Sequence, residues 1–183
     1  QGQFKQALDK FNVVCDESSE RDQVAEAYAS KASELDKQMK LVMQSLQITD
    51  ILNDDVLRRS FEDFCVAEQS QENFTVWNKI REYRLIEGAD ERFQFANDLY
   101  NTYISIHGSE FVNINKAMRK EVLDKLSNNE QAPVDQTLFD QIQKDLEVLM
   151  TTDTLSRFKA SEQFQSDFSS SSFGVKVPPL EEM

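Results

Sequence analysis

Apolar residues recur at intervals of three and four along most of the chain, a spacing that places them on one face of an α-helix. Helical stripes of this kind cover residues 4–14, 24–46, 54–66, 70–88, 90–107, 116–127, 138–150 and 153–164. Gly occurs four times and Pro three times, so few residues interrupt these stripes. The pattern predicts an all-α fold.

Polar residues at the helix boundaries indicate where the helices begin. Ser70 and Asp153 are residue types favoured at N-caps, and Asp54 lies in an acidic turn that is typical of a helix N-terminus. We expect three parts: an N-terminal helical extension (1–43), a central helical domain (44–165) and a Ser/Pro-containing C-terminal tail (166–183). Apolar residues in the tail predict that it docks on the helices: Phe168, Phe173, Val175, Val177 and Leu180.

Composition and charge narrow the class of protein. The 183 residues are 39% hydrophobic and include 13 Phe, which is enough to build a buried core. A net charge of −13 disfavours nucleic acid as a partner, because phosphate binding needs the opposite sign. We found no apolar run of roughly 20 residues and no signal-peptide pattern, so we expect a cytoplasmic protein that does not insert into membranes. Cys15 and Cys65 fit reduced thiols, and a start at Gln1 suggests a fragment of a longer protein.

The sequence carries none of the usual catalytic or metal-binding motifs. It has no G-x-x-x-x-G-K loop, no H-E-x-x-H and only one His, His107, at a predicted helix end. We therefore expect no catalytic residue, no metal and no cofactor in this chain.

Three polar segments at predicted helix boundaries are unexplained by the apolar stripes alone. Each has an ordinary structural interpretation, as an N-cap, a turn or an i,i+4 ion pair between Asp153 and Arg157. The segments are S-Q-E-N-F-T-V-W at 70–77, F-V-N-I-N at 111–115, and L-F-D-Q-I-Q-K-D-L-E-V-L-M-T-T-D-T-L-S-R-F at 138–158.

In this order and spacing, the segments resemble the regulator of G-protein signalling (RGS) domain family, over residues 46–164. The resemblance implies a two-part helical bundle that binds the switch regions of a heterotrimeric G-protein α subunit in its GTP or transition-state form. It also implies that the domain activates GTP hydrolysis by that subunit. Asn73 matches the family's asparagine that approaches the catalytic glutamine of the α subunit, Glu72 matches the neighbouring switch contact, and Asn113 matches a second asparagine that supports another switch.

The resemblance also assigns roles in the third segment. Asp153 matches a carboxylate that accepts a backbone N–H from the first switch, and Arg157 matches the base that holds this carboxylate in place. Thr154 stands where the family usually has Ser. Two departures, Phe111 in place of a frequent acidic residue and Gln69 in place of an aromatic residue, leave the targeted α subclass open.

Two questions remain open at this point. The first is whether the chain activates hydrolysis or is an adaptor that binds an α subunit, or another protein, without accelerating hydrolysis. Separately, the heptad steps of residues 24–46 fit either a helix packed on the domain's own flank or a seam for self-association. Recruitment to the inner face of the plasma membrane is expected only through partners or flanking segments.

Overall fold

A computed structural model describes residues 18–130 and 132–174. The described residues divide into two compact units, one that holds residues 18–46 and 173–174 and one that holds residues 47–130 and 132–172. In the described residues every regular element is helical, which confirms the predicted fold class. None of the described helices is long and apolar enough to cross a membrane.

The first unit is described mainly by one long helix, α2 (Ser18–Ser45). The predicted seam residues Val24, Leu35 and Met39 are half-buried. The predicted short helix at residues 4–14, Cys15, and the tail residues Val175, Val177 and Leu180 lie outside the described residues.

In the second unit, four helices build a part with a phenylalanine core. They are α3 (Ile48–Asn53), α4 (Asp55–Ala67), α9 (Leu155–Ala160) and α10 (Glu162–Phe168). The ring of Phe158 lies 5.1 Å from Phe61 and 5.0 Å from Phe164, and Phe164 lies 5.9 Å from Phe168. These rings are fully buried, so they join α4 to α9 and α10 as one core.

The end of this unit is tied back to the start of α4. Asp54 accepts N–H bonds from Val56 (3.0 Å) and Leu57 (2.9 Å) through one oxygen, as an N-cap does, and from Ser172 (2.7 Å) through the other. Burial raises the pKa of this carboxyl, but the hydrogen bonds from Ser172, Leu57 and Val56 together lower it below its usual range. The acidic turn is thus a helix N-terminus, as predicted, and the described residues contain no cluster that fits a metal ion.

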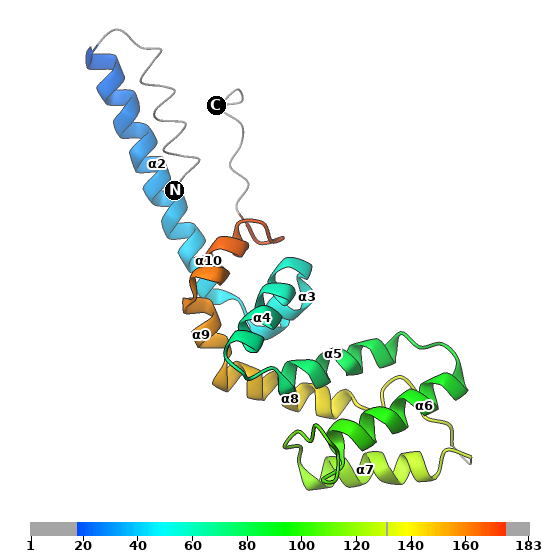
Figure 1. The fold of residues 1–183 in the computed structure, drawn as a ribbon. Helices are drawn as coiled ribbons and strands as arrows, with labels where there is room; N and C mark the ends of the chain where they lie inside the picture. The colour runs from blue at the N-terminus through cyan, green and yellow to red at the C-terminus, as the bar shows by residue number, and fades with distance from the viewer. Residues whose placement is uncertain (1–17, 131, 175–183) are drawn as a thin grey trace. The chain divides into compact units, whose positions relative to one another are not determined.

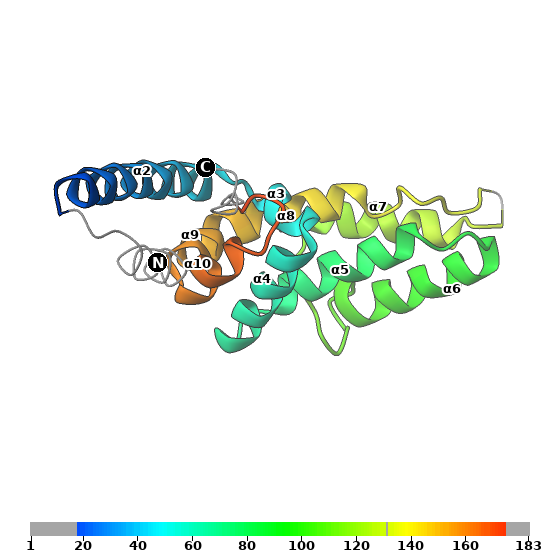
Figure 2. The same ribbon diagram turned by 90° about the horizontal axis from the view of Figure 1, so that it is seen from above.

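The rest of the second unit is a bundle of α5 (Glu72–Arg84), α6 (Ala89–Leu99), α7 (Lys116–Ser127) and α8 (Asp140–Asp153). Helix α5 packs on α8 and α6, and α6 packs on α7. Trp77 donates from Nε1 to Glu147 Oε1 at 2.9 Å, which ties α5 to α8. Successive helices run in opposite directions, so the start of α5, the end of α6, the start of α7 and the end of α8 meet at one end of the bundle (Figures 1 and 2).

Helix α6 does not simply stop but continues as a π-helical turn, η1 (Tyr100–Ile104). The carbonyls of Thr102 and Tyr103 then accept the N–H groups of Glu110 (3.1 Å) and Val112 (2.9 Å). The chain after η1 therefore folds back onto the carbonyls of the helix that it has just left.

Gly108 lies inside this fold-back. A Cβ added there would lie 2.3 Å from the carbonyl oxygen of Thr102 and 2.8 Å from that of Asn101. Only a residue without a side chain fits this close approach between two backbone segments.

Several predicted helix boundaries were wrong. Ser70 does not cap α5, which begins at Glu72 after Gln71, and the Ser70 hydroxyl is buried without a hydrogen-bond partner. Asp153 is the last residue of α8 and caps no helix. The segment predicted as one final helix is two, α9 and α10, and α10 runs past the predicted domain boundary at 165.

Candidate functional site

The first corner of the bundle end, residues 68–73, is a tightly hydrogen-bonded turn. Ser70 N–H donates to the Cys65 carbonyl (2.9 Å) and Gln69 N–H donates to that of Val66 (3.1 Å), the two bonds of a Schellman motif at the end of α4. Gln69 adopts a φ of 55°, the left-handed conformation that this motif requires and that usually falls to Gly. The backbone entering α5 is therefore fixed, at the cost of strain in a residue with a side chain.

Glu72 and Asn73 follow this turn in the first turn of α5. Glu72 is exposed and Asn73 is half-buried. Within the described part of the chain neither side chain has a hydrogen-bond or ion-pair partner. One carboxylate and one amide thus have hydrogen-bonding groups that no described residue uses.

The second corner, residues 109–115, is a non-helical segment in which the Ile114 N–H donates to the Val112 carbonyl at 2.8 Å and so turns the chain at Asn113. Val112 and Ile114 are buried, whereas Asn113 between them is exposed and has no side-chain partner in the described residues. Asn115 ends the corner by accepting the N–H of Ala117 at 2.8 Å, and so caps α7. Two buried anchors therefore present the Asn113 amide outward.

The aromatic residue Phe111 lies two residues before Asn113 in this corner. Phe111 is 40% exposed, and the guanidinium of Arg119 lies 5.2 Å from the ring centroid. Arg119 also donates to the Ile114 carbonyl at 3.0 Å, so it fixes both the ring and the backbone of the corner. At position 111, where the resembled family frequently has an acidic residue, this chain thus presents an aromatic ring that packs on the Arg119 guanidinium.

The third corner, residues 151–157, connects α8 to α9. Asp153 is exposed at the end of α8, and its carboxylate has no partner among the described residues. Thr154 is buried at the junction between the two helices, so it is the least accessible of the predicted contact residues. Thr151 and Thr152 donate their hydroxyl groups back to carbonyls of α8.

Arg157 does not hold the Asp153 carboxylate, and this detail of the sequence interpretation was wrong. Its Nε donates to Glu68 Oε2 at 2.8 Å, and its Nη1 donates to the backbone carbonyl of Asp153. The i,i+4 spacing suggested a side-chain pair, but Glu68 of the first corner competes for the same guanidinium. Arg157 consequently joins the third corner to the first.

The surroundings of the first corner are acidic. The buried thiol of Cys65 lies beneath it, and desolvation, reinforced by the negative charge of Glu72, raises the pKa of this thiol to about 12. Around the first and third corners Glu68, Glu72 and Asp153 are acidic and Arg157 is basic, whereas Arg119 lies at the second corner. The first and third corners therefore suit a partner surface with basic or N–H-donating groups.

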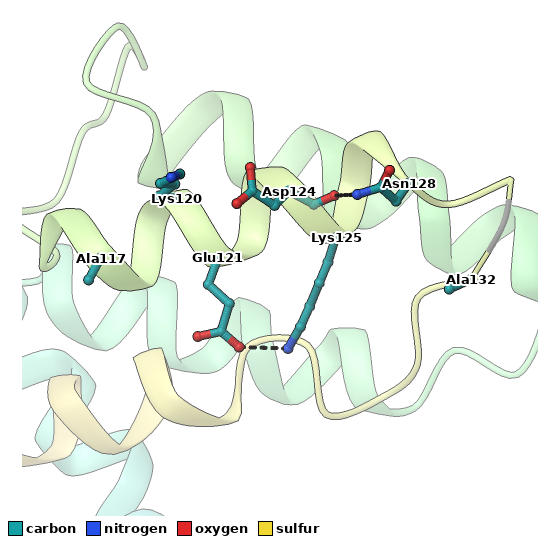
Figure 3. Close-up of a pocket in the computed structure, with 7 residues that line it drawn as sticks. All are labelled: Ala117, Lys120, Glu121, Asp124, Lys125, Asn128 and Ala132. Carbon is teal, nitrogen blue, oxygen red and sulfur yellow. Dashed lines mark hydrogen bonds and ion pairs between the residues drawn. The ribbon is translucent and has the colours of Figure 1, made fainter.

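An open hollow on α7 involves none of the predicted contact residues (Figure 3). Some of its polar groups already bond to one another: Lys125 pairs with Glu121 at 2.8 Å, and Asn128 donates to the Asp124 carbonyl at 2.8 Å. It is lined by Ala117, Lys120, Glu121, Asp124, Lys125, Asn128 and Ala132.

Figure 1 shows the start of α5, the start of α7 and the end of α8 at one end of the bundle. Glu72 and Asn73 begin α5, Asn113 precedes α7, and Asp153 ends α8, with Thr154 and Arg157 following it in the chain. Sequence reasoning missed Glu68, for which there was no signal. Gly108 was expected only to end the long helical stripe together with His107, and its close approach to the Thr102 carbonyl was not predicted.

Known proteins are similar to this chain over most of the second unit. A family model described as the regulator of G protein signaling domain matches residues 47–166. Regulator of G-protein signaling 5 from Bos taurus is 30% identical over 106 residues, which cover 58% of this chain and 56% of the bovine protein. Regulator of G-protein signaling 13 from Mus musculus is 30% identical over 98 residues, 54% of this chain and 59% of the mouse protein.

A longer relative matches over the same region. Regulator of G-protein signaling loco from Drosophila melanogaster is 28% identical over 116 residues, 63% of this chain but 7% of the fly protein. The chain therefore spans little more than half of the bovine and mouse relatives and a small part of the fly relative. Because the family model covers well over half of the chain and coincides with a helical unit whose three corners carry the matching residues, the chain belongs to the regulator of G-protein signalling family.

Proposed function

We propose that the second unit accelerates GTP hydrolysis by a heterotrimeric G-protein α subunit, by binding its switch regions in the transition-state arrangement. The chain is then a regulator of another protein's reaction and needs no active site. Glu72, Asn73, Asn113 and Asp153 make the switch contacts, while Thr154 and Arg157 support Asp153.

One observation carries the proposal. Three corners far apart in the sequence meet at one end of the bundle and present side chains whose hydrogen-bonding groups no described residue uses. Two of these side chains are amides, which each offer two donors and one acceptor without placing a net charge in an interface. A carboxylate such as that of Asp153 accepts an N–H bond more strongly than a neutral group does.

The physical chemistry of the reaction explains why such contacts suffice. An α subunit supplies in cis the Arg that neutralises the transition state and the Gln that orients the attacking water. A partner that binds the switches more tightly in that arrangement than in the ground state lowers the barrier. A 100-fold acceleration requires only about 2.7 kcal/mol, which a few hydrogen bonds provide.

A binding panel over nucleotide states tests the proposal. We expect tighter binding to an α subunit loaded with GDP and aluminium fluoride than to one loaded with GDP or with a non-hydrolysable GTP analogue, because the first mimics the transition state. The panel is run over several α subclasses, since the chain does not identify its target. Equal binding to all three states would leave the adaptor function and exclude acceleration by this mechanism.

Asn73→Ala tests the site itself. Loss of about two hydrogen bonds made in the transition state predicts a single-turnover rate at least tenfold lower. The matched control is Asn128→Ala, an exposed asparagine at the opposite end of the bundle, which we expect to leave the rate unchanged. An unchanged rate for Asn73→Ala in a folded domain would remove Asn73 from the site.

A further inference from the structure

The side chain of Arg157 joins two of the three corners. From α9 it donates to the carboxylate of Glu68, at the end of α4 and 89 residues away in the sequence, and also to the backbone carbonyl of Asp153. The third corner is thereby linked to the first through one planar group.

This ion pair is a weak contributor to folding. Its side chains are 51% (Arg157) and 39% (Glu68) exposed, and exposed pairs contribute little to stability because solvent screens them. The phenylalanine core already packs α9 against α4. The pair therefore adds little to the packing of α9 on α4, but it does connect the Asp153 corner to the corner that precedes Asn73.

Both ends of the link are attached to rigid backbone. Glu68 is the C-cap of α4, and its N–H bonds to the Phe64 carbonyl at 3.0 Å immediately before the left-handed Gln69. Arg157 lies in the first turn of α9, where the Phe158 N–H bonds to the Thr154 carbonyl at 3.0 Å. A link between two fixed points limits the relative motion of the two corners.

We propose that Glu68 is a positioning residue for the α-subunit contacts and acts through Arg157. The inference rests on the function proposed above. Glu68 holds the Arg157 guanidinium, which in turn holds the Asp153 carbonyl, so that the Asp153 carboxylate and the Asn73 amide are presented at a fixed separation.

A double-mutant cycle separates positioning from direct contact. If Glu68 acts through Arg157, removing Glu68 has no further effect once Arg157 is gone. If Glu68 touches the α subunit by itself, the two losses multiply. The cycle uses Glu68→Ala, Arg157→Ala and the double variant, with Asp63→Ala as the matched control that removes an exposed carboxylate from the same helix.

The first readout is the half-maximal concentration of the domain in single-turnover GTP hydrolysis. We expect Glu68→Ala to raise it about five- to tenfold, the double variant to equal Arg157→Ala within about twofold, and Asp63→Ala to match wild type. Denaturation midpoints of all variants are expected to stay close to that of wild type. Multiplying losses, or an effect of Asp63→Ala equal to that of Glu68→Ala, would overturn the proposal.

The second readout needs no α subunit, so it tests the link even if the proposed function fails. The Arg157 Nε–H, observed by NMR in the free protein, is expected to be protected from solvent exchange in wild type and in Asp63→Ala. It is expected to lose this protection in Glu68→Ala. Protection that survives the loss of Glu68 would overturn the link, whereas a wild-type domain that accelerates no α subunit would refute the proposed function alone.

Discussion

The substitution Gly108→Ala tests how closely the chain after η1 packs against the helix that it leaves. The added Cβ would lie 2.3 Å from the Thr102 carbonyl oxygen, whereas weak C–H···O contacts occur at about 3.3–3.6 Å. The nearest atoms to this Cβ are all backbone atoms of Asn101 and Thr102, so no flexible side chain can move out of the way. The segment must shift by about 1 Å.

The expected loss of stability follows from what this shift disrupts. The Thr102 carbonyl accepts the Glu110 N–H at 3.1 Å, and losing that bond costs about 1 kcal/mol. Overpacking adds about 1–3 kcal/mol, and the lower chain entropy of unfolded Ala returns about 0.4–1 kcal/mol. We therefore expect the free energy of unfolding to fall by about 2 kcal/mol.

Urea denaturation of Gly108→Ala and Gly88→Ala measures this loss against a matched control. A Cβ at Gly88 would meet only Glu91 atoms at 3.6 Å, which is ordinary contact, so we expect a change below about 0.5 kcal/mol there. The shifted loop also carries Asn113, so α-subunit affinity is expected to fall for Gly108→Ala and not for Gly88→Ala. Equal stabilities of the two variants would refute the steric argument.

Two further predictions concern the ends of α4. Asp54→Ala is expected to lower the free energy of unfolding at neutral pH by about 2 kcal/mol, since it removes an N-cap and the bond from Ser172. Because the folded pKa of Asp54 lies below 3.8, this difference is expected to disappear as the pH falls through the folded value; a gap that persists in acid-denaturation curves would argue against the capping role. Gln69→Gly is expected to raise the free energy of unfolding by about 0.5–1 kcal/mol in urea melts, because Gly adopts a positive φ without strain, and destabilisation would contradict the strained turn.

The periodicity of apolar residues predicted the helices because that pattern is local. The Phe61 and Phe158 stripes each predict a buried face, and the structure packs these faces together. The N-cap predictions failed where a tertiary or turn contact intervened. At Ser70 the Schellman motif extends the turn and moves the N-cap of α5 one residue further on, to Gln71.

The other features that the sequence did not predict depend mainly on contacts between segments far apart in the chain. The i,i+4 rule considered Asp153 as the partner of Arg157, but it has no information on Glu68, which folding brings within 2.8 Å. The π-helical turn η1 also has no sequence pattern that separates it from an α-helix of the same composition. The candidate contact residues came from the resemblance, whereas their meeting at one end of the bundle follows from the alternating directions of the helices.

The hydrogen bond between Asp54 and Ser172 determines how close the two ends of the second unit lie to each other. It brings the last residue of the unit to the start of α4, and only the six residues of α3, about 9 Å of helix, separate that point from the first residue. Neighbouring termini are what circular permutation requires. A short linker from residue 172 to residue 47, with new ends opened in the turn at 128–130, is therefore expected to yield a folded domain whose three corners are unchanged.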